Sequence, residues 1–245
     1  MTIISAANIP FRPGLTVKQP TLRDICSAAT LDAKGQTHTG YEQYTAYVNV
    51  LCLKVENLLP PEVLSLLPQE EVDRLNIFTV LVSGDGYREL LHNALSFFLV
   101  EPIAFDEKEK CFVAGESKID AQNYDELRRI LLKICRIESD DIIKPKFKSE
   151  RSRSIFEKIQ KGRKQMQEAK AKAGNDAYAL PNVISALSAK HPSINLFNIW
   201  DLTISQVYDQ FNRTYVNAQT DIIGYRWAAW GKDNFDFTTW FKNLK

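Results

Sequence analysis

The feature that most constrains the fold is a strongly basic segment, residues 144–172, which lies past the middle of the 245-residue chain. It holds eleven Lys or Arg residues against three Glu residues, a net charge of +8, which leaves about −7 for the rest of a chain whose total is +1. Its large apolar residues are sparse and include Ile155, Phe156, Ile159 and Met166. Such a composition cannot supply a core, so we expect a long solvated helix that connects two folded parts.

The two flanking parts have the composition of globular protein. Hydrophobic residues make up 44% of the chain and charged residues 25%, which argues against overall disorder. We expect a mainly α protein with an N-terminal helical domain, a small β-hairpin or meander insert, a basic connector helix and a C-terminal tryptophan-rich helical domain. The expected boundaries are an extended arm at 1–20, a helical domain at 21–140 with the β insert near 96–120, a linker helix at 141–177 and an aromatic-rich helical domain at 178–245.

Apolar residues at three- and four-residue steps predict the helices of the first part. The clearest runs from Tyr41 to Leu59 and ends before two prolines. A capped helix is expected after Thr21. Further helices are expected at 62–67, 69–82, 87–95 and 123–137.

A change of pattern predicts the β insert. Residues 96–105 are aromatic and β-branched, 106–109 form a polar turn, and 111–114 form a second short run. We expect a hairpin, with a third strand at 118–120.

The C-terminal part is the richest in aromatic residues and contains all four tryptophans. Helices are expected at 182–190, 199–215, 221–230 and 236–244, with Gly231 closing the third. The aromatic side chains have two interpretations: the core of a helical subdomain, or an exposed anchor for a partner protein, where Trp and Tyr dominate binding. The candidate partner-binding residues are Trp200, Tyr208, Phe211, Trp227, Trp230, Trp240 and Phe241.

No residue pattern predicts catalysis, and we expect neither an enzyme nor a metal or cofactor site. The four cysteines are widely spaced without a C-x-x-C pair, so buried free thiols are expected rather than a zinc site. The histidines His38, His92 and His191 give no Ser or Cys triad. Residues 83–86 contain two glycines but lack the lysine of a phosphate-binding loop.

The basic segment has two interpretations as well. Its cations, with Phe147 and Phe156 for stacking, suit nucleic acid, although the acidic remainder of the chain opposes a continuous positive groove. The alternative is a linker helix that steers an acidic partner protein, for which the candidate patch is Lys158, Lys161, Arg163 and Lys164. No basic and apolar leader and no apolar run of about 20 residues is present, so a cytoplasmic protein without membrane contact is expected.

Three stretches resemble a known family. They are VISALSAKHPSINLFNIWDLTISQVYDQF at 183–211, WGKDNFD at 230–236 with WFKNL at 240–244, and VKQPTLRDI at 17–25. They are similar to the tail assembly chaperones encoded in the tail-morphogenesis modules of phages of Gram-positive bacteria. The resemblance is strong over about a quarter of the chain and extends elsewhere only to the order of elements.

The resemblance implies a protein that acts in the host cytoplasm by non-covalent contact. Such chaperones coat the tape measure protein, a long helical rod, until tail tube subunits replace them. The implied partners are the tape measure protein, the tail tube protein and a further copy of the chain. A structural virion protein of the tail, baseplate or connector, and a nucleic-acid-binding protein that uses the basic segment, remain the alternatives.

Overall fold

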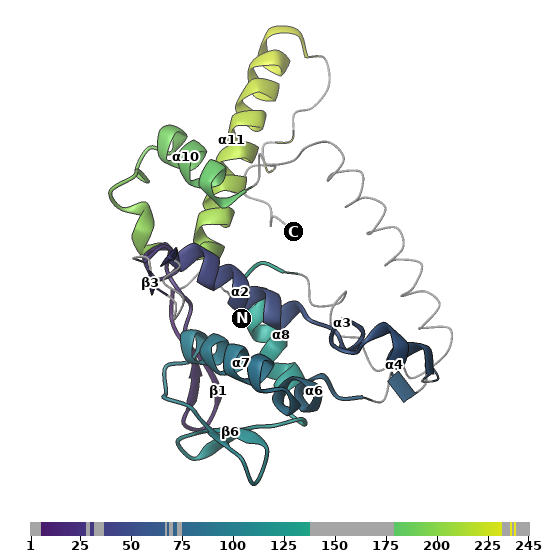
Figure 1. Ribbon diagram of the computed structural model, residues 1–245. Helices are drawn as coiled ribbons and strands as arrows, with labels where there is room; N and C mark the ends of the chain where they lie inside the picture. The colour runs from purple at the N-terminus through teal and green to yellow at the C-terminus, as the bar shows by residue number, and fades with distance from the viewer. Residues whose placement is uncertain are drawn as a thin grey trace. The chain divides into compact units, whose positions relative to one another are not determined.

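The computed structural model describes residues 6–27, 30–31, 37–66, 68, 71–72, 75–137, 179–231, 236 and 238. Backbone contacts divide the chain into two compact units, which we call the N-terminal unit (Ala7–Gln160) and the C-terminal unit (Lys161–Lys245 with Met1–Ala6). The described residues are mainly α-helical with a few short strands, which confirms the predicted fold class (Figure 1). The basic connector and the domain boundaries within 138–178 lie outside the described residues and stay predictions.

The N-terminal unit opens with a hairpin in place of the extended arm. Strand β1 (Ile9–Arg12) pairs antiparallel with β2 (Leu15–Val17), and Gly14 takes a positive φ in the turn between them. Alternation along β2 buries Leu15 and Val17 completely. The backbone of this hairpin also pairs with residues 98–100, because Lys18 donates to the Phe98 carbonyl over 2.7 Å and Val100 donates to Thr16 over 3.0 Å. The strands of this proline-containing segment are short, but the segment still contributes Leu15 and Val17 to the core.

Helices make up most of this unit. Thr21 caps the start of α1 (Leu22–Ile25), as predicted, in a capping box with Asp24. Helix α2 (Gly40–Cys52) begins at Gly40, where a Cβ would clash with the backbone of Ile25 and Ser27. A ladder of two residues per strand, β3 (Thr30–Leu31) with β4 (Thr37–His38), precedes α2. The helices are α1 (Leu22–Ile25), α2 (Gly40–Cys52), α3 (Val55–Leu58), α4 (Pro61–Leu66), α6 (Ile77–Ser83), α7 (Asp85–Phe98) and α8 (Tyr124–Ile134).

A buried arginine explains why the predicted helix 41–59 is broken into α2 and α3. Arg128 of α8 is 2% exposed, and its Nε donates to the Leu51 carbonyl over 2.6 Å while its Nη2 donates to the Leu53 carbonyl. Leu53 is extended, so the helix ends there. The guanidinium thus satisfies carbonyl groups that the end of α2 leaves without helical partners.

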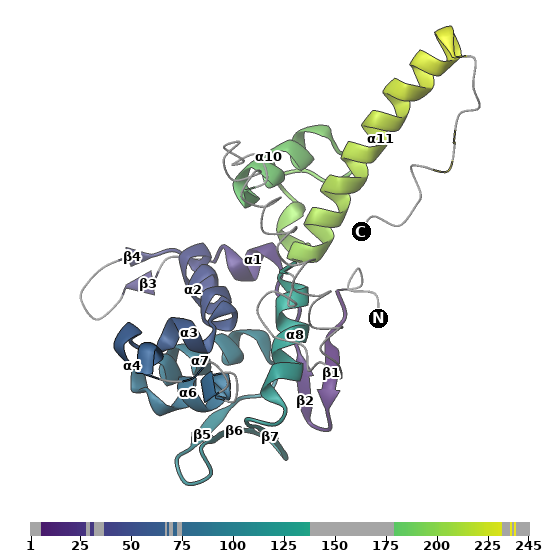
Figure 2. The same cartoon turned by 90° about the vertical axis from the view of Figure 1, so that its right-hand side faces the viewer.

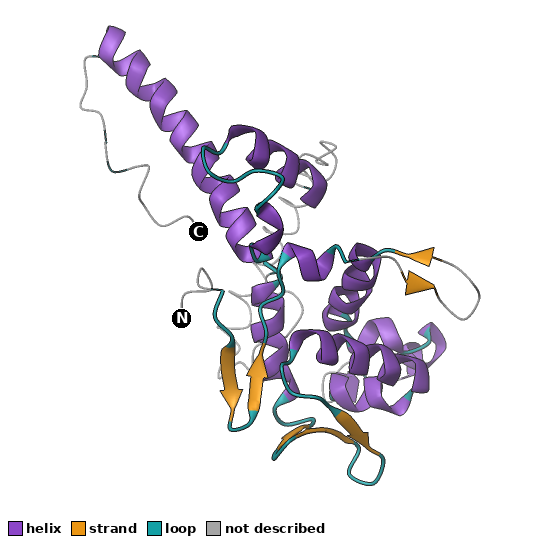
Figure 3. Cartoon of the chain, turned by 90° about the vertical axis from the view of Figure 1, so that its left-hand side faces the viewer, coloured by secondary structure: helices purple, strands orange, loops and turns teal. Residues whose placement is uncertain are grey.

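The β insert forms the predicted three-stranded meander, with a later start. Strands β5 (Ala104–Asp106), β6 (Cys111–Ala114) and β7 (Ser117–Ile119) pair antiparallel in that order. Figure 3 shows these strands in orange next to the helices of the unit, where Phe112 of β6 packs against Phe78 and His92. The prediction of a strand from residue 96 was wrong, because α7 continues to Phe98 and buries that ring on the same face as Leu91 and Leu95.

The C-terminal unit contains α10 (Leu180–Lys190), a 3-10 turn η3 (Ile199–Asp201) and α11 (Ile204–Trp230). Two separate helices were predicted at 199–215 and 221–230, but α11 is one helix of 27 residues, because residues 216–220 contain no glycine or proline to break it. Its start has a Thr203–Gln206 capping box, and Gly231 ends it as predicted. The predicted helix at 236–244 lies outside the described residues except for Asp236 and Thr238.

The role assigned to Arg128 is testable by unfolding. We expect Arg128→Met to lower the free energy of unfolding by about 3 kcal/mol, because the carbonyls of Leu51 and Leu53 lose their donor inside the core. Arg129→Met, on the exposed side of the same helix, should change it by about 0.5 kcal/mol or less. Urea unfolding followed by circular dichroism measures both, and equal effects would contradict the assignment.

Candidate functional site

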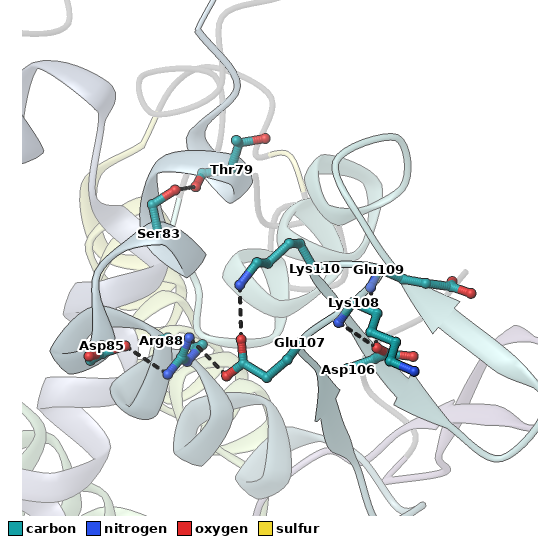
Figure 4. A network of polar contacts seen from close by, with 9 residues as sticks. All are labelled: Thr79, Ser83, Asp85, Arg88, Asp106, Glu107, Lys108, Glu109 and Lys110. Carbon is teal, nitrogen blue, oxygen red and sulfur yellow. Dashed lines mark hydrogen bonds and ion pairs between the residues drawn. The ribbon is translucent and has the colours of Figure 1, made fainter.

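The most extensive polar network of the described residues ties the β5–β6 turn to α7 (Figure 4). Arg88 of α7 pairs with Asp85 at 2.7 Å and with Glu107 at 3.1 Å, and its guanidinium lies 5.0 Å from the centre of the Phe105 ring. Glu107 also accepts from Lys110 over 2.9 Å. The arginine thereby fastens a polar turn to a helix.

The carboxylates of this network have the electrostatics of a structural cluster. Backbone N–H groups of Glu109 and Lys108 donate to Asp106 and hold its pKa below the usual value. The hydrogen bond from Lys110 likewise lowers the pKa of Glu107. A general acid needs a raised pKa, so neither carboxylate is tuned for proton transfer near neutral pH. A nearby hollow, between α6 and this turn, has a volume of about 250 Å³, below the roughly 300 Å³ at which small-molecule sites usually begin.

Two of the thiols and two of the imidazoles have structural roles. The prediction of buried free thiols is confirmed for Cys111 and Cys135, whereas Cys52 is half-buried and Cys26 is exposed. Burial raises the pKa of the Cys135 thiol to about 12 and raises the pKa of Cys111, so both stay protonated and unreactive. His92 contacts the Ile103 carbonyl at 3.2 Å, and Nδ1 of His191 accepts the N–H groups of Ser193 and Ile194. No cluster of His, Cys, Asp or Glu suited to a metal ion occurs in the part of the chain that the structure describes.

The unusual surface of the molecule is the second half of α11. The first turns of this helix bury Ile204 and Val207 and pack against α10. The later part of α11 extends past α10, as Figure 2 shows. Six large apolar side chains between Tyr215 and Trp230 are exposed. Trp230 is 80% exposed and Tyr225 is 77% exposed. Single exposed apolar residues are ordinary, but a contiguous set on one helix is typical of a binding surface.

These side chains form two faces, each named here after its aromatic residues. The tyrosine face is Tyr215, Ile222 and Tyr225, and the tryptophan face is Ile223, Trp227 and Trp230. At about 100° per residue the centres of the two faces lie roughly 120° apart, and together they span about 200° of the helix circumference. A helix that packs on one partner buries an apolar stripe somewhat over 100° wide. The exposed surface is therefore wide enough for two partners.

The candidate residues from the sequence separate into three groups. Trp227 and Trp230 lie on the tryptophan face, and the ring of Trp227 also packs against Gly231, where a Cβ would clash with it. Trp200, Tyr208 and Phe211 are half-buried near the start of α11, and Trp200 Nε1 donates to the Leu196 carbonyl over 2.7 Å. The candidates outside the described residues are Trp240, Phe241, Lys158, Lys161, Arg163 and Lys164.

Sequence reasoning missed the tyrosine face. Tyr215, Ile222 and Tyr225 recur at seven- and three-residue steps, but the interpretation of two separate helices placed Tyr215 on a different element from the other two. It also missed Phe197, which is 91% exposed beside exposed Leu196 in the loop before η3. Interpreting 204–230 as one helix would have placed Tyr215, Ile222 and Tyr225 on one face, whereas no periodic signal identifies Phe197.

Comparison with known proteins gives one match. Residues 169–245, fewer than a third of the chain, match the family model described as YomV second domain, which is a phage-associated family. No curated protein sequence and no solved structure matches the chain. The matched range includes α10 and α11 and therefore both apolar faces. Separately, every helix of the described ranges is too short or too polar to cross a bilayer.

The structural role of the polar network gives a prediction. We expect Arg88→Met to cost about 1 kcal/mol of stability or less, because its ion pairs are largely exposed while the methionine keeps the contact with Phe105. The difference in stability between the wild type and Arg88→Met should be smaller in 1 M NaCl, because salt screens the ion pairs of Arg88 in the wild type. Thermal unfolding at low and high salt measures this, and a salt-independent loss of several kcal/mol would contradict it.

The exposure of the tryptophan face gives another prediction. Ile223→Ser and Trp230→Ser should each change the free energy of unfolding by about 0.5 kcal/mol or less, because more than half of the surface of each residue is already in contact with water. Leu187→Ala, which removes a fully buried side chain from α10, should cost about 2–4 kcal/mol. Urea unfolding compares the three variants, and a large loss for Trp230→Ser would assign Trp230 to the core.

Proposed function

We propose that this chain is a phage tail assembly chaperone that binds helical segments of the tape measure protein through the tryptophan face of α11. The observation that carries the proposal is the exposure of Ile223 and Trp230 beside Trp227 on one side of a helix. An amphipathic helix pairs with an apolar groove or stripe through residues at three- and four-residue steps. The match of residues 169–245 to a phage-associated family supports a role in a phage.

The chemistry of the surface suits reversible cover of an apolar rod. Tryptophan contributes large contact area with few rotatable bonds, so contacts through two indole rings are strong for their size. The area is small, however, and release by tube subunits requires moderate affinity for each contact. No bond is made or broken in this role, in keeping with the structural use of the ionisable residues described above.

The basic segment adds an electrostatic contribution to the proposal. Positive charge lies close in sequence to α10 and α11, at Lys158, Lys161, Arg163 and Lys164. Such a patch speeds encounter with an acidic partner more than it strengthens the final contact. The tail tube protein is a second proposed partner, since it must meet the complex when it replaces the chaperone.

The test is co-expression with the tape-measure-like product of the neighbouring gene. We expect the wild-type chain to keep that product soluble and to co-purify with it. Trp230→Ser should weaken binding by about 2 kcal/mol, roughly 30-fold in Kd, since tryptophan is enriched among binding hot spots. Tyr87→Ser is the matched control, because Tyr87 is an exposed aromatic residue of α7 in the other unit and should leave binding unchanged.

Three outcomes would overturn the proposal. Aggregation of the tape-measure-like product despite co-expression would remove the chaperone activity. Fixed copy number in purified particles would favour a structural virion protein. Salt-dependent retention on DNA or RNA that is lost when Lys158, Lys161, Arg163 and Lys164 become Glu would favour nucleic-acid binding.

A further inference from the structure

The tyrosine face belongs to a regular heptad stripe. Starting from Tyr215, apolar residues follow at steps of three, four, three and four, through Ala218, Ile222, Tyr225 and Ala229. This spacing keeps one seam of a helix turned towards a parallel neighbour, as in a coiled coil. The tryptophan face lies on a different side of α11 and is not needed for this seam.

The same stripe begins inside the C-terminal unit. Ile204, Tyr208 and Phe211 precede Tyr215 at the same steps, and Ile204 is buried where α11 packs with α10. Only the part of the stripe beyond α10 is exposed, and Ile222 there is 67% exposed. The chain thus builds a helix-packing seam and covers about half of it with its own residues.

The charges beside the seam identify the occupant. With Tyr215 and Ile222 at heptad positions a, Asp221 falls at position g and Arg226 at position e, and both are exposed. In a parallel pair, position g of one helix faces position e of the next heptad on the other helix, five residues further along. Asp221 and Arg226 are five residues apart, so each would face the opposite charge on a second copy. Within one helix the same two residues point about 140° apart and cannot pair.

We infer that α11 pairs in parallel with α11 of a second copy of this chain, through the tyrosine face and two symmetric Asp221–Arg226 ion pairs. Two of the five seam residues, Ala218 and Ala229, are small, which lets the two helices approach closely at those positions. Two heptads bury a small interface, on the order of 1,000 Å² or less, so we expect dissociation in the micromolar range. The pairing does not depend on the partner proposed for the tryptophan face.

Charge reversal on the full-length chain tests this inference. Sedimentation equilibrium from about 1 µM to several hundred µM should show a monomer–dimer equilibrium for the wild type. Asp221→Arg and Arg226→Asp should each weaken self-association roughly tenfold, because each turns two attractive pairs into two repulsive ones. An equimolar mixture of the two variants should dimerise as well as the wild type, since every pair is then attractive again. Asn217→Arg, on the polar side of the same helix, is the matched control and should leave the equilibrium unchanged.

The outcomes separate the possible occupants of the seam. Preferential heterodimers in the mixture, with neither variant altering circular dichroism or the unfolding midpoint, support the parallel pair. A wild-type chain that is monomeric at every concentration overturns the inference, whether its own C-terminal residues or another protein covers the seam. A dimer that ignores both charge reversals overturns it too, because it forms elsewhere or antiparallel. A self-associating chain that fails to bind the tape-measure-like product would leave this inference standing and remove only the proposed function.

Discussion

The long helix α11 has more apolar surface than its own unit can cover. Its first turns pack with α10, but from Tyr215 to Trp230 the described part of the unit provides no comparable burial, and large side chains face water on two sides. Each 100 Å² of apolar surface left in water forgoes about 2.5 kcal/mol of stabilisation. Covering such a surface by association would recover that free energy, which is why the proposals above rest on the geometry of α11.

The N-terminal unit, in contrast, buries large apolar side chains in a core of its own. The hairpin β1–β2 pairs with the end of α7, an aromatic ring of α2 packs on one of α7, a ring of α6 packs on one of β6, and Arg128 satisfies the carbonyls where α2 ends. Arg88, Asp106 and Glu107 serve ion pairs and a turn, and the thiols of Cys111 and Cys135 are buried in the packing.

Periodicity made most helices predictable, and its failures have physical causes. The steps of three and four predicted α2, α8 and α10 because one face of each is buried. The run after Ser96 misled because aromatic residues suit both strands and buried helices, and only burial of Phe98 beside Leu95 decides between them. The break at Leu53 has no local cause, since Arg128 lies far away in sequence. The hairpin at 9–17 has a local turn at Gly14, but residues 98–100, which also pair with it, are equally distant. Among the exposed residues of α11, Trp227 and Trp230 were candidates from the sequence. The tyrosine face could not be predicted without knowing that α11 is one continuous helix.

Two faces on one helix have a consequence for reversible binding. A single tryptophan face offers a small contact, and a chaperone that must leave its client needs each contact to be weak. In a parallel α11 pair, two tryptophan faces are held at a fixed distance, so the second contact with a repetitive rod forms at a high effective concentration. The overall avidity would then rise although no individual contact is stronger, and an incoming subunit would need to displace only one weak contact at a time. Because the two faces are about a third of a turn apart, the pairing proposed here would leave both tryptophan faces open to the proposed client, and the wide apolar arc would then serve two contacts at once.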